Sequence, residues 1–150
     1  MKHNLCPTAA AKIRGGPDYP GVKGMVRLFR CCNGTILEVE LTGLPETDSG
    51  FFALHIHEGS SCTGKDFPET GGHWNPGKQM HPNHAGDLPV LLGNHGSAYM
   101  KVFTGRFLIE EIIGKTVIIH SGPDDFHTQP SGNAGAKIAC GLIEKCIGSR

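Results

Sequence analysis

The chain has 150 residues, a length that suits one domain with a single core, and we expect residues 1–150 to form that domain. Its 14 basic and 14 acidic side chains balance when histidine is neutral, which argues against nucleic-acid binding and a polybasic membrane patch. No apolar run approaches the ~20 residues that span a bilayer, so no membrane association is expected. The first residues, MKHNLCPTAAAKIRGG, lack the apolar core of a signal peptide. We therefore expect a protein that is either cytoplasmic or exported with its signal removed.

Short apolar runs separated by Gly, Pro or Asn predict about eight strands and no amphipathic helix. In chain order, the predicted strands are residues 11–14, 22–31, 35–41, 51–57, 97–103, 107–111, 115–120 and 137–144. The CNG that begins at Cys32 predicts a hairpin turn. In the strand that follows, Leu37, Val39 and Leu41 alternate with other residues, as in a half-buried strand. This pattern favours an all-β antiparallel sandwich or barrel.

Two long segments, residues 58–92 and 121–136, interrupt the strands, and loops of such length are usually functional or disordered. Histidines flank both. In the HIHE sequence His55 and His57 share one face of a strand, and we expect the apolar neighbours on the other face to point into the core. The imidazoles would then lie under the first loop. The second loop starts where TVIIH ends, at His120.

The first loop contains the sequence GGHWNPGKQMHPNHAGD, whose Gly, Pro and Asn content indicates neither helix nor strand. With the flanking histidines it makes seven candidate ligands: His55, His57, His73, His81, His84, Asp87 and His120. Imidazole suits zinc and copper, and a single carboxylate suits zinc better than Cu(I). Seven ligands exceed the four of one tetrahedral site, so two metals are expected. The alternative is a set of ordinary surface histidines, but six of the nine histidines fall in this set.

Two glycine-rich segments resemble phosphate-binding loops only superficially. GSSCTGKD, residues 59–66, almost matches GxxxxGK[ST], but Asp66 occupies the hydroxyl position and no helical pattern follows. GNAGAK, residues 132–137, lacks the dinucleotide-binding spacing. Nucleotide binding is not expected.

The six cysteines show no CxxC pair, so neither a zinc ribbon nor a thioredoxin-like site is indicated. Their pattern alone allows between zero and three disulfides. Cys31 and Cys32 are adjacent on a predicted strand and would face opposite sides, one toward the core and one toward the surface. Cys6 and Cys146 are given the same structural interpretation, without a function.

Five segments within residues 50–143 resemble those of the copper–zinc superoxide dismutases and occur in the same order: GFFALHIHEGSSC, GGHWNP, HAGDLP, GKTVIIHSGPDD and GNAGAKIACGLI. The chain resembles the bacterial members of this family. The resemblance implies an all-β fold, an eight-stranded antiparallel Greek-key barrel of immunoglobulin-like sandwich architecture with two long functional loops. It also implies an oxidoreductase that converts superoxide anion to O₂ and hydrogen peroxide by Cu(II)/Cu(I) cycling, with zinc in a structural role.

The resemblance implies a role for each candidate. The copper ligands would be His55, His57, His73 and His120, and the zinc ligands would be His73, His81, His84 and Asp87. His73 would bridge the metals and be catalytic, leaving copper on reduction to carry a proton. Asp124 would link a copper ligand to a zinc ligand, and Cys62 and Cys140 would form a disulfide. A homodimer is compatible with the resemblance, which leaves the contact surface open.

Three departures from the family pattern affect these expectations. In AKIAC, Lys137 stands where the family usually has arginine; it is expected to guide the anion, with a weaker anion site, unless it is an ordinary solvated lysine. Only two residues separate His81 from His84, which leaves open which of them binds zinc, with His95 and His127 as substitutes. The segment 120–132 is short, so steering of superoxide is expected to differ.

A second function remains compatible with this sequence. A protein of the same fold could hold zinc or copper with little dismutase activity, and the lysine and the trimmed loops favour that alternative. A purely structural sandwich domain would leave the clustered imidazoles unexplained.

Overall fold

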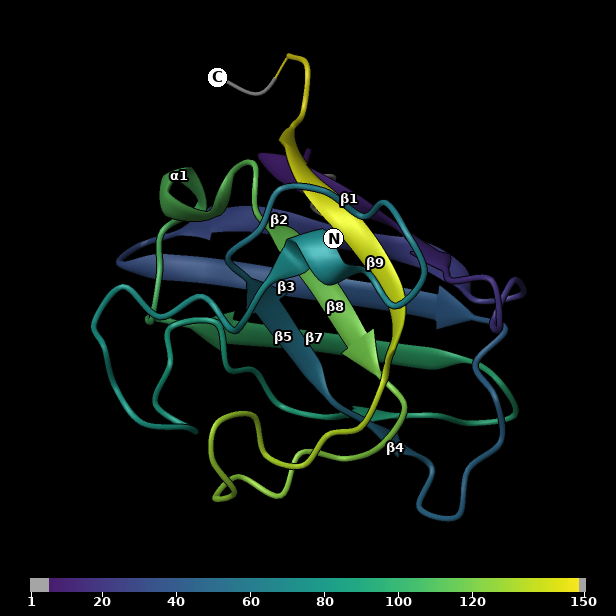
Figure 1. Cartoon of the computed structure of the whole chain (residues 1–150). Coiled ribbons are helices and arrows are strands. Elements are labelled where there is room, and N and C mark those ends of the chain that lie inside the picture. The colour runs from purple at the N-terminus through teal and green to yellow at the C-terminus, as the bar shows by residue number, and fades with distance from the viewer. Residues whose placement is uncertain (1–5, 149–150) are drawn as a thin grey trace.

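Strands dominate the computed structural model, which describes residues 6–148 (Figure 1). Seven antiparallel strands form one curled sheet in the order β5-β8-β9-β1-β2-β3-β7, and β4 pairs with β6 in a second, two-stranded sheet. The strands are β1 (Ala9–Gly15), β2 (Lys23–Cys31), β3 (Gly34–Thr42), β4 (Phe51–Phe52), β5 (Leu54–His57), β6 (Leu91–Leu92), β7 (Ala98–Thr104), β8 (Thr116–His120) and β9 (Lys137–Lys145). Two short helices complete the set, the 3-10 helix η1 (Pro68–Thr70) and α1 (Ile109–Ile112).

The short pair β4 and β6 closes the sheet into a barrel. The edges of the seven-stranded sheet are β5 and β7. Strand β4 leads into β5, and β6 both pairs with β4 and contacts β7. The buried side chains of both sheets therefore form one apolar core, as expected for an all-β barrel.

Most predicted strands are confirmed, with two differences in detail. The predicted strand 51–57 is divided at Ala53, whose backbone bonds to Gly122 and His120 of the second-loop region. The two-residue strand β6 lies inside the predicted first loop. The short strands flanking Ala53 thus belong to two sheets, and the break brings the start of the second loop next to β5.

The predicted strand 107–111 is wrong, because this segment enters the helix α1. Ile109 and Ile112 are buried while Glu110 and Glu111 are exposed, a spacing that suits one turn of helix. The Glu111 carboxylate also accepts a hydrogen bond from the Leu108 N–H at 2.7 Å, which caps the turn. A short apolar run cannot distinguish these two conformations by its periodicity.

The predicted hairpin turn is confirmed between β2 and β3, where Cys31 pairs with Gly34. Cys32 lies in the turn with a positive φ of 39°, so its predicted position on a strand is wrong. Neither thiol lies in the core, because Cys31 is half-buried and Cys32 is exposed. Of the other two free cysteines, Cys146 is half-buried and Cys6 is exposed. Gly34 is needed here, since a Cβ at this position would come within 2.3 Å of the Thr104 carbonyl oxygen.

Within residues 6–148, no helix has the length and apolar character needed to cross a membrane.

Candidate metal centre

The backbone of the first loop runs alongside β5 and so brings the loop's candidate ligands to those of the strand. Ile56 accepts a hydrogen bond from the Trp74 N–H at 2.8 Å and donates its own N–H to Gly86 at 2.9 Å. Isolated bridges pair His55 with Asp87 and His57 with His73. Gly86 permits this approach, because a Cβ there would lie 2.3 Å from the Ile56 carbonyl oxygen. The loop therefore behaves as an added edge beside β5.

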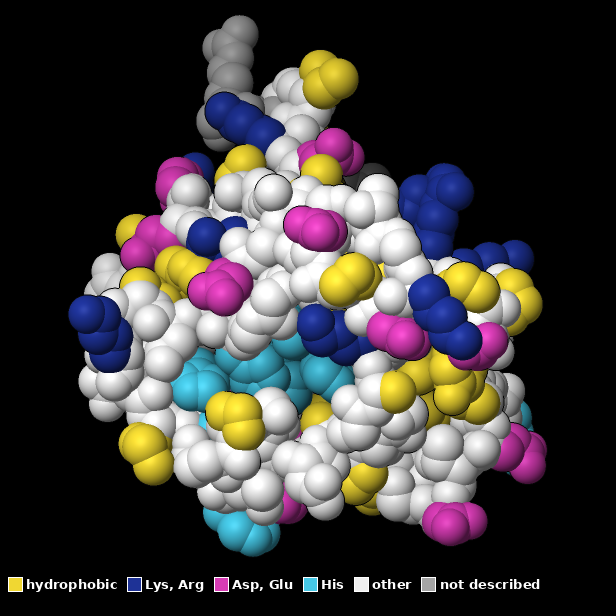
Figure 2. All heavy atoms as spheres, in the orientation of Figure 1, with side chains coloured by type: hydrophobic (Ala, Val, Ile, Leu, Met, Phe, Trp, Pro, Cys, Tyr) yellow, Lys and Arg dark blue, Asp and Glu magenta, His cyan; other side chains and the backbone are white. Residues whose placement is uncertain are grey.

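The alternation predicted for β5 is confirmed. Leu54 and Ile56 belong to the apolar core, and His55 and His57 are 0% and 2% exposed on the opposite face. They are covered by the first loop, as expected. On one face of the molecule, histidine side chains form the floor of a hollow with a basic side chain at its edge (Figure 2).

The seven candidate ligands form two groups that share His73. The nitrogens of His55, His57, His73 and His120 lie within 4.8 Å of one another, and the ligand atoms of His73, His81, His84 and Asp87 do so as well. His120, at the end of β8, joins the first group because β8 pairs with β5. The structure thus brings together the seven candidate ligands, in the two predicted sets.

In three histidines of the first group, the ring nitrogen that points away from the group donates a hydrogen bond to an oxygen. His57 Nδ1 donates to the Gly71 carbonyl at 2.9 Å, and His120 Nδ1 donates to the Gly135 carbonyl at 3.1 Å. His55 Nε2 donates to the Asp124 carboxylate at 2.7 Å. These partners leave the lone pair of each opposite nitrogen directed into the group, which is how neutral histidines are oriented for metals.

The inward nitrogens have no satisfactory partners among the described residues. The buried atoms His55 Nδ1 and His73 Nε2 accept and donate nothing, and His57 Nε2 faces His120 Nε2 at 3.4 Å. Two lone pairs that face each other repel unless a proton or a cation lies between them, and buried polar groups are otherwise rarely left unpaired. A copper ion suits this set of imidazoles.

The second group has the mixed character that suits zinc. His73 Nδ1 lies 2.7 Å from Asp87 Oδ1 and 3.3 Å from His84 Nδ1. His81 Nδ1 lies 3.1 Å from Asp87 Oδ2, but not in the orientation of a hydrogen bond. The three nitrogens and one carboxylate converge from a loop segment and match the ligands that zinc takes.

Asp124 joins the two groups. One carboxylate oxygen accepts from His55 Nε2 at 2.7 Å and the other from His81 Nε2 at 2.8 Å. The Phe126 N–H also donates to Asp124, at 2.7 Å. Burial tends to raise the pKa of this carboxyl, but these hydrogen bonds outweigh it and hold the pKa below its usual range. Asp124 therefore stays ionised and fixes the tautomers of one histidine from each group.

Burial also keeps the imidazoles of the first group neutral. Removal from water lowers the pKa of His57 to about 2 and that of His120 to about 3. The pKa of His55 is lowered by the same cause, against the opposing effect of Asp124. Neutral imidazole is the form that binds metals, so no proton must be removed from these rings at neutral pH.

The two substitute ligands considered from the sequence lie outside both groups. His95 is exposed, in the connection between β6 and β7. His127 is exposed in the second loop, where its Nδ1 lies 2.8 Å from the carbonyl of Asp125. His81 and His84 both reach the second group despite their short spacing.

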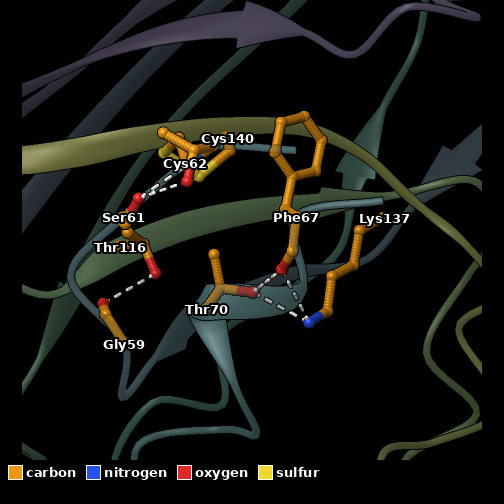
Figure 3. The surroundings of a disulfide bond; sticks show 9 residues. Gly59, Ser61, Cys62, Phe67, Thr70, Thr116, Lys137 and Cys140 are labelled. Atoms are coloured by element: carbon orange, nitrogen blue, oxygen red, sulfur yellow. Dashed lines mark hydrogen bonds between the residues drawn. A yellow bond between two sulfur atoms is a disulfide. The ribbon is translucent and has the colours of Figure 1, made fainter. Parts of the chain in front are cut away.

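Lys137 is anchored to the first loop. Its Nζ donates to Thr70 Oγ1 at 2.8 Å, to the Gly71 carbonyl at 3.0 Å and to the Phe67 carbonyl at 3.4 Å. Figure 3 shows the side chain reaching from β9 toward η1. An ammonium has three N–H donors, so the loop takes them all. Partial burial lowers the Lys137 pKa, and the charge lies close enough to lower the pKa of His57 and His120 as well.

The expected disulfide is present between Cys62 and Cys140, residues 78 apart in the chain. It ties the first loop to β9 (Figure 3). Thr116 adds a second tie, donating from Oγ1 to the Gly59 carbonyl at 3.1 Å. The loop that carries His73 is thus attached to the barrel at Gly59 and at Cys62.

Sequence reasoning missed two polar side chains, Arg106 and Gln129, that bond to the backbone of residues 81–87, the zinc-type segment. Each acts over a long sequence separation, on main-chain atoms that every residue has. No residue pattern therefore marked them in advance.

Comparisons with known proteins agree with this geometry. Residues 22–143 match the family described as copper/zinc superoxide dismutase (SODC). The chain is 32% identical to "Superoxide dismutase [Cu-Zn] 1" of Aquifex aeolicus over 81% of this chain and 79% of that protein. It is also 32% identical to "Superoxide dismutase [Cu-Zn]" of Caulobacter vibrioides, over 91% of this chain and 84% of that protein.

A solved structure shows the same likeness. The Cu/Zn superoxide dismutase from Brucella abortus superposes with a TM-score of 0.77 at 29% identity, covering 91% of this chain and 99% of that one. The fold and the paired donor groups define a copper- and zinc-binding Greek-key barrel protein. The chain belongs to the copper/zinc superoxide dismutase family.

Proposed function

We propose that this protein is a superoxide dismutase that converts superoxide to O₂ and hydrogen peroxide. The observation that carries the proposal is the pair of buried donor groups that share His73. One group offers only imidazole and the other offers imidazole with one carboxylate, and these sets suit copper and zinc respectively. Family membership and the relatives described above support the same activity.

The donor atoms of the two groups suit the metals that we propose for them. His55, His57, His73 and His120 would hold copper, and His73, His81, His84 and Asp87 would hold zinc. The unpartnered inward nitrogens and the short nitrogen–nitrogen distances support cations at both places. When bound, copper supplies one-electron exchange with superoxide, whereas zinc does no redox chemistry.

Three side chains would serve the reaction around the metals. His73 can hold a proton at Nε2, which is buried and has no other partner, and give it to the peroxide product. Asp124 keeps His55 and His81 in the tautomers that direct Nδ1 inward. Lys137 places a positive charge beside His57 and His120, where it attracts an anionic substrate.

Lys137 also supplies the observation that favours the alternative, a metal-binding protein with little turnover. Because all three N–H donors of Lys137 bond to the first loop, none is left to hold an anion by a direct hydrogen bond. We infer that the lysine guides superoxide by its charge alone. Such guidance needs no direct hydrogen bond, because steering by charge acts over a longer distance than hydrogen bonding.

The proposal is tested by the dismutation rate of protein loaded with copper and zinc, beside a zinc-only form with quantified metal. Copper-dependent turnover approaching the diffusional range of ~10⁸–10⁹ M⁻¹s⁻¹ would support the enzyme. Full copper loading with negligible turnover would favour the metal-binding alternative.

We also propose that residues 1–150 form one domain, supported by the single barrel core of the described residues. The homodimer stays a prediction, which sedimentation equilibrium of the metal-loaded protein would check.

A further inference from the structure

The side chain of Arg106 contacts the zinc-type segment, residues 81–87, and it does so at backbone atoms of that segment. The two N–H groups of Nη1 point to three carbonyl oxygens, those of Pro82 at 2.8 Å, His84 at 3.1 Å and Asp87 at 3.4 Å, so that one N–H is shared. Three carbonyl oxygens of one short loop therefore converge on one nitrogen. Such oxygens repel one another unless a cation or donor lies between them, and a guanidinium is always charged.

The backbone that carries Arg106 is itself well fixed. The Arg106 N–H donates to Thr104 Oγ1 at 3.2 Å. The next residue, Phe107, is buried and accepts a hydrogen bond from Thr35 Oγ1 at 3.1 Å. Its ring packs edge-on against Trp74, which follows His73 in the chain, at a centroid distance of 6.1 Å. Arg106 thus extends from a rigid junction between β7 and α1.

Gln129 holds the same segment from the opposite loop. Its Oε1 accepts from the His81 N–H at 3.0 Å, and its Nε2 donates to the His81 carbonyl at 2.6 Å. The amide thus pairs with both backbone groups of a single residue, as a neighbouring strand would. His81 is the first residue of the segment, and the carbonyls that Arg106 holds extend from Pro82 to Asp87.

We propose that Arg106 and Gln129 are positioning residues that hold residues 81–87 in the zinc-binding conformation and thereby set zinc affinity. The inference rests on the proposed function, in which His81, His84 and Asp87 bind zinc. Neither side chain belongs to either donor group. Both therefore act through the backbone between the ligands.

The short segment explains why such support matters. Only Pro82 and Asn83 separate His81 from His84, so the two rings reach one ion only in a tightly turned backbone. The Asn83 N–H donates to the Met80 carbonyl at 2.8 Å within this turn. A loop ordered before zinc arrives loses less conformational entropy on binding, and outer residues that orient ligands typically change metal affinity by about 10- to 100-fold.

The test measures the zinc dissociation constant of the full chain by chelator competition. It compares the wild type with Arg106→Gln and with Gln129→Ala, and the absorption spectrum of Co²⁺ in the same site reports ligand geometry. Each variant is expected to bind zinc about tenfold more weakly, and the double variant up to about a hundredfold. Arg106→Lys should recover most of the loss, because one cationic nitrogen makes all three contacts.

Matched controls remove the same groups elsewhere. Arg30 pairs with Glu110 on the exposed surface, so Arg30→Gln makes the same charge change without touching the loop. Gln79 bonds through its side-chain amide nitrogen to the carbonyl of Gly77, and Gln79→Ala should leave zinc affinity unchanged. The unfolding midpoint of each metal-free variant separates general destabilisation from a local effect.

The outcomes distinguish the inference from the proposed function. A wild type that binds no zinc would overturn both. Tight zinc binding by the wild type, with Arg106→Gln and Gln129→Ala within about twofold of it, would overturn the positioning role alone. Should Arg106→Gln fail to fold, Gln129→Ala and Arg106→Lys still decide the question by the same measurement.

Discussion

His120 distinguishes the two donor groups well, because it belongs to the first group alone. His55 also belongs only to that group but bonds to Asp124, which holds His81, and His57 forms a backbone bridge with His73. It comes from β8, whereas the second group is built entirely from the first loop. Removing its ring should therefore leave the proposed zinc ligands intact. In contrast, a change at His73 would affect both groups.

We expect His120→Ala to reduce dismutation to the background rate while zinc content stays at the wild-type value. The reason is that the remaining histidines of the first group no longer surround the copper. Turnover and bound metal are measured on the same sample, with the exposed His127→Ala as control. Retained activity would contradict the copper assignment.

Lys137 offers a second test at the level of a single side chain. Arginine has five N–H donors, so Lys137→Arg can keep bonds to the loop and still offer a donor to an anion. We expect a rate increase on the order of two- to fivefold at low ionic strength, which shrinks as salt screens the charge. The exposed Lys101→Arg is the matched control.

An unchanged rate in Lys137→Arg at low salt would argue against a guiding role. Lys137 would then serve only to anchor Thr70 and Gly71, whose carbonyl also holds His57.

Among the structural elements, the first loop depends on its attachment to β9 through the cystine. Cys140, one of the two bonded cysteines, is 2% exposed and lies in a small apolar cluster with Ile118 and Phe67. Linking residues 78 apart restricts the unfolded chain, an effect of about 4 kcal/mol in the chain-entropy model.

Urea unfolding of the metal-free protein should show this loss in the double variant Cys62→Ala/Cys140→Ala. Cys32→Ser, a change of an exposed thiol in the β2–β3 turn, is the control and should unfold as the wild type does. Equal stability of the oxidised protein and the double variant would show that the bridge does not constrain the unfolded chain.

The sequence predicted those elements whose residues carry a local pattern. The alternation of apolar with other residues predicted β3 and β5, and from it followed the prediction that His55 and His57 share one face. The segment 107–111 was predicted wrongly, because Ile109 and Ile112 suit a helical turn and the run is too short to decide. Periodicity also gave no sign of the two-residue strand β6.

The candidate ligands were predicted for a related reason, since histidine and aspartate at close spacing are visible in the sequence. The residues that hold these ligands in place were not predicted, because Arg106 and Gln129 bind backbone atoms 19 or more residues away in the sequence. Likewise, the three partners of Lys137 depend on how η1 docks against β9. Contacts of this kind follow from tertiary structure and leave no local signal.

At the scale of the whole molecule, the buried imidazoles make the metal-free fold sensitive to acid. The pKa of His57 is about 2 and that of His120 about 3 in the folded chain, against 6.5 for an unperturbed histidine. Between these values the unfolded chain binds more protons than the folded chain. Stability therefore decreases as the pH falls below 6.5.

We expect the unfolding free energy of metal-free protein to fall between pH 6.5 and pH 4, by up to about 1.4 kcal/mol per pH unit for each of the two rings. Asp124 adds to this below its usual pKa range, since its pKa is lowered on folding. Denaturant titrations at several pH values measure the slope, and His127→Gln should not alter it. A flat profile would mean that the rings are protonated in the folded state.

The barrel, the covering loops and the cystine together hold two donor groups that share one histidine, His73. Anomalous diffraction from crystals of the copper- and zinc-loaded protein tests this sharing, because each element is located at its own absorption edge. We expect copper among His55, His57, His73 and His120, zinc among His73, His81, His84 and Asp87, and the His73 ring between them. A single ion, or a metal bound without His73, would contradict it.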